Sequence, residues 1–448
     1  MFNCQSVRLE PYCRSGTSGE NMGAAIDVGV PFAPPRARHV AAVTAGNALE
    51  FYDFLTYAFF AAQIGRTFFP SSDASASLLA SLATFGAGFL MRPVGALVIG
   101  RMGDRVGRKP AMLLSFTLMG LAMIGIALTP SYKAIGIAAP ALAILCRLIQ
   151  GFALGGEIGP NTAYLIEAAP PHRRGLYVSF QYMSQDGSIL VSGLVGYLLS
   201  SAMSDAALDA WGWRAAFLIG AIIVPFGLLL RKDLAETLPA LPAGGKRAAS
   251  PPQHGLVRIA VLGLAMLAGG TVVSYTMDYL TTFATATLHM PTRIGFMAAI
   301  AVGVAGLICD PIGGWLSDRF GRKPVMMIPW AFLLVATLPG FFLLSHYRTA
   351  VALVGMAIVL QGAACVATSS VLVSVTESLP ARIRCGSLGL IYAFAISVFG
   401  GTTQFTAAWL TKLTGSPLAP AGYMTACVAA ALLAMTFLPE SAPVKTGA

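Results

Sequence analysis

The sequence predicts an all-α membrane protein whose twelve transmembrane helices form two six-helix bundles. Three observations favour this fold class. Only 11% of the 448 residues are charged, whereas a soluble domain carries about 25% charged residues because its surface faces water. Apolar stretches close to the roughly 20 residues that cross a bilayer recur about twelve times. Motifs from the first part of the chain also recur in the second part.

The apolar stretches define the predicted transmembrane helices. A helix rises about 1.5 Å per residue, so each stretch is long enough to span a hydrocarbon core. The predicted spans are 39–61, 77–100, 111–130, 135–165, 176–200, 213–230, 257–284, 295–316, 325–345, 350–374, 386–410 and 419–438.

A polar segment rich in Pro, Gly and Ala divides the chain near its middle. The N-terminal tail has no apolar signal-peptide core, and its composition changes near Met22, which we expect to be the true translation start. The predicted domains are an N-terminal tail over 1–38, a first bundle over 39–231, a central loop over 232–256, a second bundle over 257–438 and a C-terminal tail over 439–448.

The formal net charge of +10 would suggest a nucleic-acid partner in a soluble protein, but the basic residues here lie between apolar stretches. Most of the 29 Lys and Arg residues fall in loops on the side of the two termini. Basic loops stay cytoplasmic, so we expect both termini in the cytoplasm, in a bacterial inner membrane. The partner is then the lipid bilayer and not nucleic acid. The seven cysteines show no CxxC spacing, so neither a metal nor another cofactor is expected.

Two motifs are repeated in the same order. GRMGDRVGRKP at 100–110 recurs as GWLSDRFGRKP at 314–324, and EAAP at 167–170 recurs as ESLP at 377–380. Parallel repeats imply two halves related by an axis along the membrane normal.

These repeats, with RLIQG at 147–151, resemble the signature motifs of the major facilitator superfamily. GNALEFYDF at 46–54, GFLMRP at 88–93, GGE at 155–157 and FGG at 399–401 resemble its metabolite:proton symporters. That group carries citrate, tricarballylate, 2-oxoglutarate, shikimate and proline or betaine. The C-terminal FGGTTQF pattern is most similar to the citrate and tricarballylate carriers. The resemblance implies the major facilitator fold, and we expect the protein to act as a monomer.

The resemblance also implies a gating latch at the cytoplasmic ends of the helices. Alternatively, these loops could be rigid and basic and serve only to set topology. Topology requires no fixed Asp or Gly, so we favour the latch. The predicted gating residues are Asp104, Arg105, Arg108, Glu167, Arg174, Asp318, Arg319, Arg322, Glu377 and Arg384.

Several charged residues fall inside the predicted spans. A charge at the bilayer centre costs at least about 2.5–3.5 kcal/mol, so such residues should face a cavity or a partner. Glu50 and Asp53 lie one turn apart, and two nearby carboxylates resist double ionisation. With Glu157, they are the predicted proton-coupling residues. A permanent pair of one acid with Arg92 is the alternative. Asp310, just before Pro311, is predicted near an interface.

The fourth predicted span carries a polar face that includes Arg147. An Arg fork matches a carboxylate, and Gln adds a directional hydrogen bond. Ser and Thr residues on other spans are as readily explained by helix packing. The predicted substrate-binding residues are Arg92, Arg147, Gln150, Asn161, Gln181, Gln185, Asp278 and Gln361.

The leading functional hypothesis is proton-coupled uptake of a small organic acid, a di- or tricarboxylate such as citrate. Asp186, Asp278 and Asp310 would repel a multivalent anion unless they were protonated or paired. Uptake of a zwitterion such as proline or betaine is therefore the alternative. A quaternary ammonium site would favour aromatic faces, whereas all five tryptophans are predicted near helix ends. A proton-driven exporter is a third possibility and a non-transporting sensor a fourth. No nucleotide-binding motif or nucleophile arrangement suggests an enzyme.

Overall fold

The computed structural model describes residues 37–105, 108–155, 162, 165–166, 169–232, 256–379 and 384–446. All regular secondary structure in these ranges is helical. The predicted N-terminal tail with Met22, and almost all of the predicted central loop, lie outside them. Below, the first half means residues 37–232 and the second half means residues 256–446.

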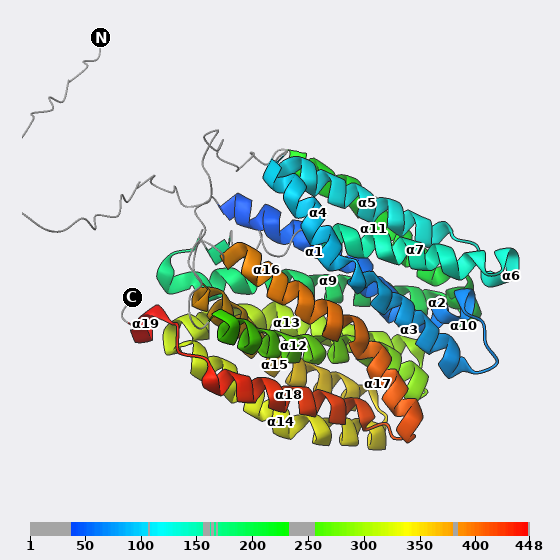
Figure 1. Ribbon diagram of the computed structural model, residues 1–448. Coiled ribbons are helices and arrows are strands. Elements are labelled where there is room, and N and C mark those ends of the chain that lie inside the picture. The colour runs from blue at the N-terminus through cyan, green and yellow to red at the C-terminus, as the bar shows by residue number, and fades with distance from the viewer. Residues whose placement is uncertain are drawn as a thin grey trace, which may run out of the picture. The chain divides into compact units, whose positions relative to one another are not determined.

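The described helices of the first half follow the predicted spans (Figure 1), with interruptions inside those spans at Phe60, at Met91 and at 136–137. They are α1 (Ala37–Phe59), α2 (Ala61–Phe68), α3 (Ala74–Leu90), α4 (Arg92–Arg105), α5 (Arg108–Leu128), α6 (Tyr132–Ile135), α7 (Ala138–Leu154), η1 (Pro171–Arg173), α9 (Arg174–Ala202), α10 (Asp205–Ala207), η2 (Leu208–Gly212) and α11 (Trp213–Lys232).

The helices of the second half are longer and more regular. They are α12 (Leu256–Thr282), η3 (Phe283–Thr287), α13 (Thr292–Phe320), α14 (Arg322–Tyr347), α15 (Ala350–Ser378), α16 (Arg384–Ala395), η4 (Ile396–Gly400), α17 (Gly401–Thr414), α18 (Ala419–Phe437) and α19 (Pro443–Thr446). The segments η3 and η4 are short π-helical turns within longer helices.

Proline and aspartate set the limits of α3. Asp73 caps its start by accepting a hydrogen bond from the Ser75 backbone N–H at 2.9 Å. Pro93 has no N–H to give and its ring crowds the preceding turn, so the regular helix is interrupted at Met91 and continues as α4. This interruption puts Arg92 at the first position of α4 and inside the membrane span.

Seven helices of the described part are both long and apolar enough to cross a membrane, six of them in the second half. Helices α1 and α9, with 23 and 29 residues, are also long enough, but they carry polar side chains that include Asp53 and Asp186. The twelve-helix arrangement in two six-helix bundles therefore stays a prediction. Large apolar side chains such as Val335 and Phe342 are exposed on α14, as expected for a surface that faces lipid.

Most helix contacts stay within one half of the sequence. Helix α1 packs on α9 and α11, and α5 packs on α7 and α11, while α12 packs on α18 and α15 packs on α13 and α14. Two long contacts join the halves, α9 against α13 and α3 against α17 (Figure 1). The cavity described below is lined by residues from both halves.

Glycine makes the α9–α13 contact close. A Cβ atom at Gly303 would overlap the backbone of Leu190, and one at Gly196 would overlap the ring of Phe296. Association in lipid depends on such close van der Waals packing, because no hydrophobic effect drives helices together there. The two helices therefore meet backbone to backbone over much of their length.

Candidate functional site

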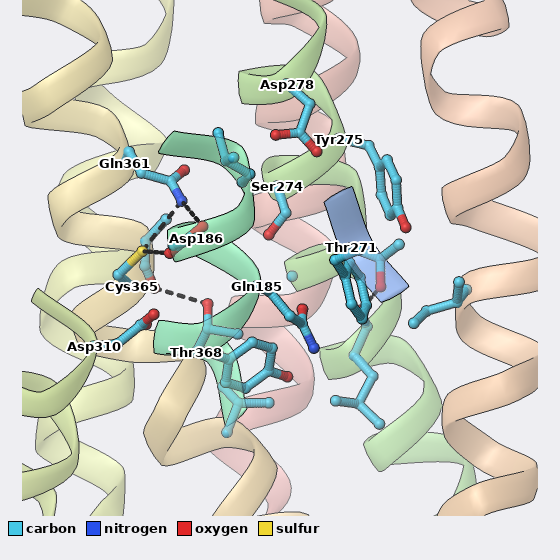
Figure 2. Close-up of a pocket in the computed structure, with 18 of the residues that line it drawn as sticks. Gln185, Asp186, Thr271, Ser274, Tyr275, Asp278, Asp310, Gln361, Cys365 and Thr368 are labelled. Atoms are coloured by element: carbon cyan, nitrogen blue, oxygen red, sulfur yellow. Dashed lines mark hydrogen bonds between the residues drawn. The ribbon is translucent and has the colours of Figure 1, made fainter. Parts of the chain in front are cut away.

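A central cavity lies between the two halves, with polar side chains from five helices in its wall (Figure 2). Helix α9 supplies a cluster from the first half, and α12, α13, α15 and α16 supply the rest. The polar lining residues are Tyr182, Gln185, Asp186, Thr271, Ser274, Tyr275, Asp278, Asp310, Gln361, Cys365, Thr368 and Tyr392. Phe51, Phe54 and Trp330 add aromatic surface.

The central cavity is acidic. Asp186, Asp278 and Asp310 are each at least nine-tenths buried, and none of its described lining residues is Lys, Arg or His. Asp310, which was predicted near an interface of the membrane, is buried in the cavity wall, where its position on α13 brings it against Asp186 of α9. Trp330, predicted near a helix end, is fully buried in the cavity wall.

A second, smaller pocket holds the two buried arginines and is called the arginine pocket below. It is lined by Asp53, Phe54, Gly88, Arg92, Arg147, Gln150, Gly151 and Leu154. The ring of Phe54 lines both this pocket and the central cavity. The guanidinium carbons of Arg92 and Arg147 lie 5.2 and 5.3 Å from its centroid, so cation–π attraction helps to hold them.

Close backbone packing positions the arginines. A Cβ atom at Gly151 would overlap the backbone of Gly88, and one at Gly155 would overlap that of Arg92. Helix α7 therefore lies directly against α3 and α4. One turn of α7 places Arg147 beside Gln150, and Nη1 of the arginine donates to Oε1 of the glutamine at 2.6 Å. The predicted polar face of this helix is confirmed for these two residues.

Asp53 is fully buried beside Arg147 without being bonded to it. Neither of its carboxylate oxygens has a hydrogen-bond donor among the described residues. The alternative of a permanent pair with Arg92 is therefore not seen for Asp53. The side chains of Glu50, Glu157 and Asn161 lie outside the described part of the structure, so their predicted roles stay predictions.

The remaining predicted binding residues divide into two groups. Gln185, Asp278 and Gln361 line the central cavity. Gln181 does not line it, and its Oε1 accepts a hydrogen bond from Thr162 at 2.6 Å. The serines of α9 serve packing, since Ser188 donates to the carbonyl of Ala48 on α1.

Three of the predicted latch residues of the second half, Asp318, Arg322 and Glu377, form a buried network at the end of α13. Arg322 is fully buried and contacts Asp318 at 2.7 Å and both carboxylate oxygens of Glu377 at 3.2 Å. Asp318 also crosses to the first half, where it accepts hydrogen bonds from the backbone N–H groups of Gly175 and Leu176 at 2.8 and 2.9 Å. These two N–H groups belong to the first turn of α9 and have no partner within the helix.

Other members of the predicted latch lie elsewhere or are not described. Arg174 comes within 3.9 Å of Glu377 across the halves, whereas Arg319 is exposed and packs near the rings of Trp315 and Phe320. Outside the described side chains lie Asp104, Arg105, Arg108, Glu167 and Arg384.

Two contacts of this region, made by Glu440 and Ser441, were not predicted from the sequence. Glu440, after α18, accepts hydrogen bonds from the backbone N–H groups of Arg322 and Lys323 at the start of α14. Burial raises the pKa of Glu440, but these and two further backbone N–H bonds outweigh it, and the net pKa lies below the ordinary value. Ser441 beside it donates to Glu377 at 2.9 Å. The only signal in the sequence was an acid directly after the last apolar span.

At the opposite end of the bundle a second ion pair joins the halves. Nζ of Lys412 at the end of α17 lies 2.5 Å from Asp73 at the start of α3. The lysine and then the Ser75 N–H hold the pKa of Asp73 below its usual range. In this structure the halves are therefore tied at both ends, with the central cavity between them.

A buried polar cavity between two packed halves of an apolar helical chain is the site of a membrane transporter. Two stretches, 39–237 and 250–446, match the sugar (and other) transporter family. The chain belongs to this family of the major facilitator superfamily, among the proton symporters that include the citrate carriers. Its members are transporters and not enzymes.

Three relatives show the range within the group. The citrate-proton symporter of Klebsiella pneumoniae is 34% identical over 88% of this chain and 90% of its own length. The alpha-ketoglutarate permease of Escherichia coli K12 is 36% identical over 89% and 93%. The proline/betaine transporter of the same strain is 32% identical over 90% and 83%. A crystal structure of a D-xylose-proton symporter has the same fold, with a TM-score of 0.72 at 19% identity over 92% of this chain and 99% of that one.

Proposed function

We propose that this protein takes up a small organic acid, a di- or tricarboxylate such as citrate, together with protons. Transport would proceed by alternating access of the central cavity across a bacterial inner membrane, with both termini in the cytoplasm. The citrate-proton symporters of Klebsiella pneumoniae and Salmonella typhi, at 34% and 37% identity, support this substrate class. The protein would act as a monomer.

The observation that carries the proposal is an acidic central cavity separated from the two arginines by Phe54. When ionised, Asp186, Asp278 and Asp310 would repel an organic anion in this low-dielectric space. Once protonated, a carboxyl group loses its charge and can donate a hydrogen bond to a substrate carboxylate. The anion would therefore bind well only after proton uptake, which couples the two movements.

The arginine pocket supplies the positive charge that an anion needs. Nη2 of Arg92 and Nε of Arg147 have no hydrogen-bond partner among the described residues. Arg92 lies next to Tyr275, which lines the central cavity. Movement of the Phe54 ring would open a path between a bound carboxylate and these guanidinium groups.

A zwitterion such as proline or betaine is the second candidate. Carboxylates surrounded by the rings of Trp330, Phe51 and Tyr275 could also attract a quaternary ammonium group. The proline/betaine transporter of Escherichia coli K12, at 32% identity, supports this candidate. In that case the acids would work in their ionised form.

Reconstituted uptake separates these proposals. The full chain in liposomes is offered labelled citrate, 2-oxoglutarate, shikimate or betaine, with and without an inward proton gradient. We expect citrate or 2-oxoglutarate to accumulate only with the gradient and to be lost when a protonophore collapses it. Accumulation of betaine alone would support the second candidate. Equal uptake with and without the gradient would reject proton symport.

A further inference from the structure

Two buried acids that are not among the predicted coupling residues lie close together between the halves. Asp186 lies on α9 in the first half and Asp310 on α13 in the second half, and both are buried. A Cβ atom at Gly306 would overlap the carboxylate of Asp186. This glycine, one turn before Asp310, therefore lets the Asp186 side chain lie against the backbone of α13.

Two donors from α15 fix the Asp186 carboxylate. Nε2 of Gln361 lies 3.4 Å from Oδ1 and Sγ of Cys365 lies 3.3 Å from Oδ2. Figure 2 shows both contacts on the same side of the cavity, with Asp310 below them. One carboxylate oxygen of Asp186, one of Asp310 and Sγ of Cys365 all lie within 4.8 Å of one another. Asp186 thus accepts hydrogen bonds on both oxygens.

Asp310 is in the opposite situation. It is 1% exposed, and neither of its carboxylate oxygens has a donor among the described residues. An ionised carboxylate buried without any donor is very costly. A protonated one needs no donor and can itself donate to a neighbouring carboxylate. The carboxylate of Asp186 is in position to accept a hydrogen bond from a protonated Asp310.

No cation offsets the charge of this pair among the described side chains around it. The titratable groups that face it are Tyr182 of α9, Asp278 of α12, Cys309 of α13, Cys365 of α15 and Tyr392 of α16. All of these are neutral or negative. Two ionised carboxylates side by side would therefore repel each other strongly, as in any buried carboxylate dyad.

We propose that Asp186 and Asp310 share one proton across the interface of the two halves, and that this proton travels with the substrate. It would be a second carried proton, separate from any at Asp53. The step involves no covalent chemistry, since the proton passes between water and the dyad. With the proton present, a hydrogen bond joins α9 to α13, and without it the two carboxylates repel across the same interface. The role in transport rests on the proposed symport.

The proton itself can be tested without transport. Infrared spectra of the purified full chain in lipid nanodiscs, recorded over a range of pH, report the C=O stretch of protonated carboxyl groups. We expect D186N and D310N to change the same titrating band, because one proton belongs to both residues. D310N should abolish the band, since the remaining Asp186 is held ionised by its two donors, whereas D186N should shift its frequency and midpoint, since Asp310 keeps a proton but loses the neighbouring charge. D53N and the exposed D205N should leave the band unchanged. Changes in two different bands, or in none, would overturn the shared proton.

A second variant keeps both acids and so tests the dyad even if D186N or D310N fails to fold. Cys365→Ala removes a donor to Asp186 and leaves both acids in place. The ionised dyad then loses a stabilising contact, so we expect the midpoint of the band to move to higher pH. An unmoved midpoint would contradict Asp186 as the ionised member. The same donor set could also hold a metal ion. A rise in the melting temperature of the wild type with Na⁺ or Mn²⁺ that D310N abolishes would overturn the proton assignment.

Transport then tests the role of this proton. In liposomes, D310N should lose gradient-driven accumulation by about tenfold or more, whereas exchange of internal for external substrate, which needs no net proton movement, should fall by less. D205N serves as the control for the type of substitution. Normal accumulation by D310N would overturn the role in coupling. If the wild type itself ignores the gradient, the proposed symport fails, and the infrared result still decides whether the dyad holds a proton.

Discussion

Asp53 is a buried carboxylate whose two oxygens find no donor, although Arg147 is close by. Asp53→Asn keeps the shape of the side chain and removes both its charge and its capacity to carry a proton. We expect proton-driven uptake to fall by about tenfold or more, with substrate exchange retained. The measurement is labelled uptake in liposomes with a gradient, followed by counterflow without one.

The control for this substitution is Asp205→Asn, at an exposed position at the start of α10. It makes the same chemical change outside the cavity and should leave both rates unaltered. Wild-type proton dependence in D53N would remove Asp53 from the coupling mechanism. The dyad band described above should survive in this variant, which separates the two acids.

Residue roles were predictable from the sequence where they depend on local spacing. Arg147 and Gln150 are three residues apart on a helix, so their side chains had to share a face, and they are hydrogen-bonded. Asp186 and Asp310 lie far apart in the sequence, and their contact depends on the missing Cβ of Gly306. No periodicity encodes such an approach, and the contact between Asp186 and Asp310 was therefore not predicted.

The α9–α13 contact depends on glycine, which gives a prediction at the scale of elements. Gly303→Ala adds a Cβ that meets the backbone N and Cα of Leu190, and backbone cannot move aside as a side-chain tip can. Overpacking of this kind costs about 1–3 kcal/mol. We expect a lower melting temperature and weaker transport, measured by thermal unfolding in detergent and by uptake.

Gly355→Ala on α15 provides the matched control, since no atom lies within 4 Å of a Cβ placed there. Alanine favours a helix over glycine by about 1 kcal/mol, so the melting temperature should stay the same or rise. An equal loss in both variants would show that the close α9–α13 contact does not explain the effect.

Helix positions were also predictable where the apolar pattern was uninterrupted. The predicted spans 295–316 and 350–374 lie inside α13 and α15, which extend a turn or so beyond them into polar residues. The predicted span 77–100 is broken at Met91, because Pro93 overrides the apolar pattern. The π-helical turns η3 and η4 were not predicted, since their extra residue depends on packing between helices.

The whole molecule is tied at both ends by contacts between its halves. At the predicted cytoplasmic end Asp318 accepts from the first turn of α9, and at the other end Lys412 pairs with Asp73. Because the pKa of Asp73 is lowered, its contribution is fully present above the unfolded value of about 3.9 and is lost as pH falls through the lower folded value. The tie between Lys412 and Asp73 therefore persists over the range of pH in which uptake is measured.

Weakening one tie should shift the balance between conformations towards opening at that end. Asp318→Asn removes the charge that holds the backbone N–H groups of Gly175 and Leu176. We expect faster hydrogen exchange in the first turn of α9, measured by mass spectrometry, and slower exchange at the start of α3. Lys412→Gln should do the reverse, with faster exchange near Ser75 and greater protection at α9, because opening at one end requires closure at the other.

Lys323→Gln separates this effect from a general loosening of the same end. Its Nζ donates to the carbonyl of Thr436 at 2.9 Å, a contact within the second half. Loss of that bond should leave exchange in the first turn of α9 unchanged. If K323Q raises it as much as D318N does, Asp318 is not a tie between the halves. If D318N and K412Q both raise exchange at both ends, the two ties stabilise the fold together and do not oppose each other in a transport cycle.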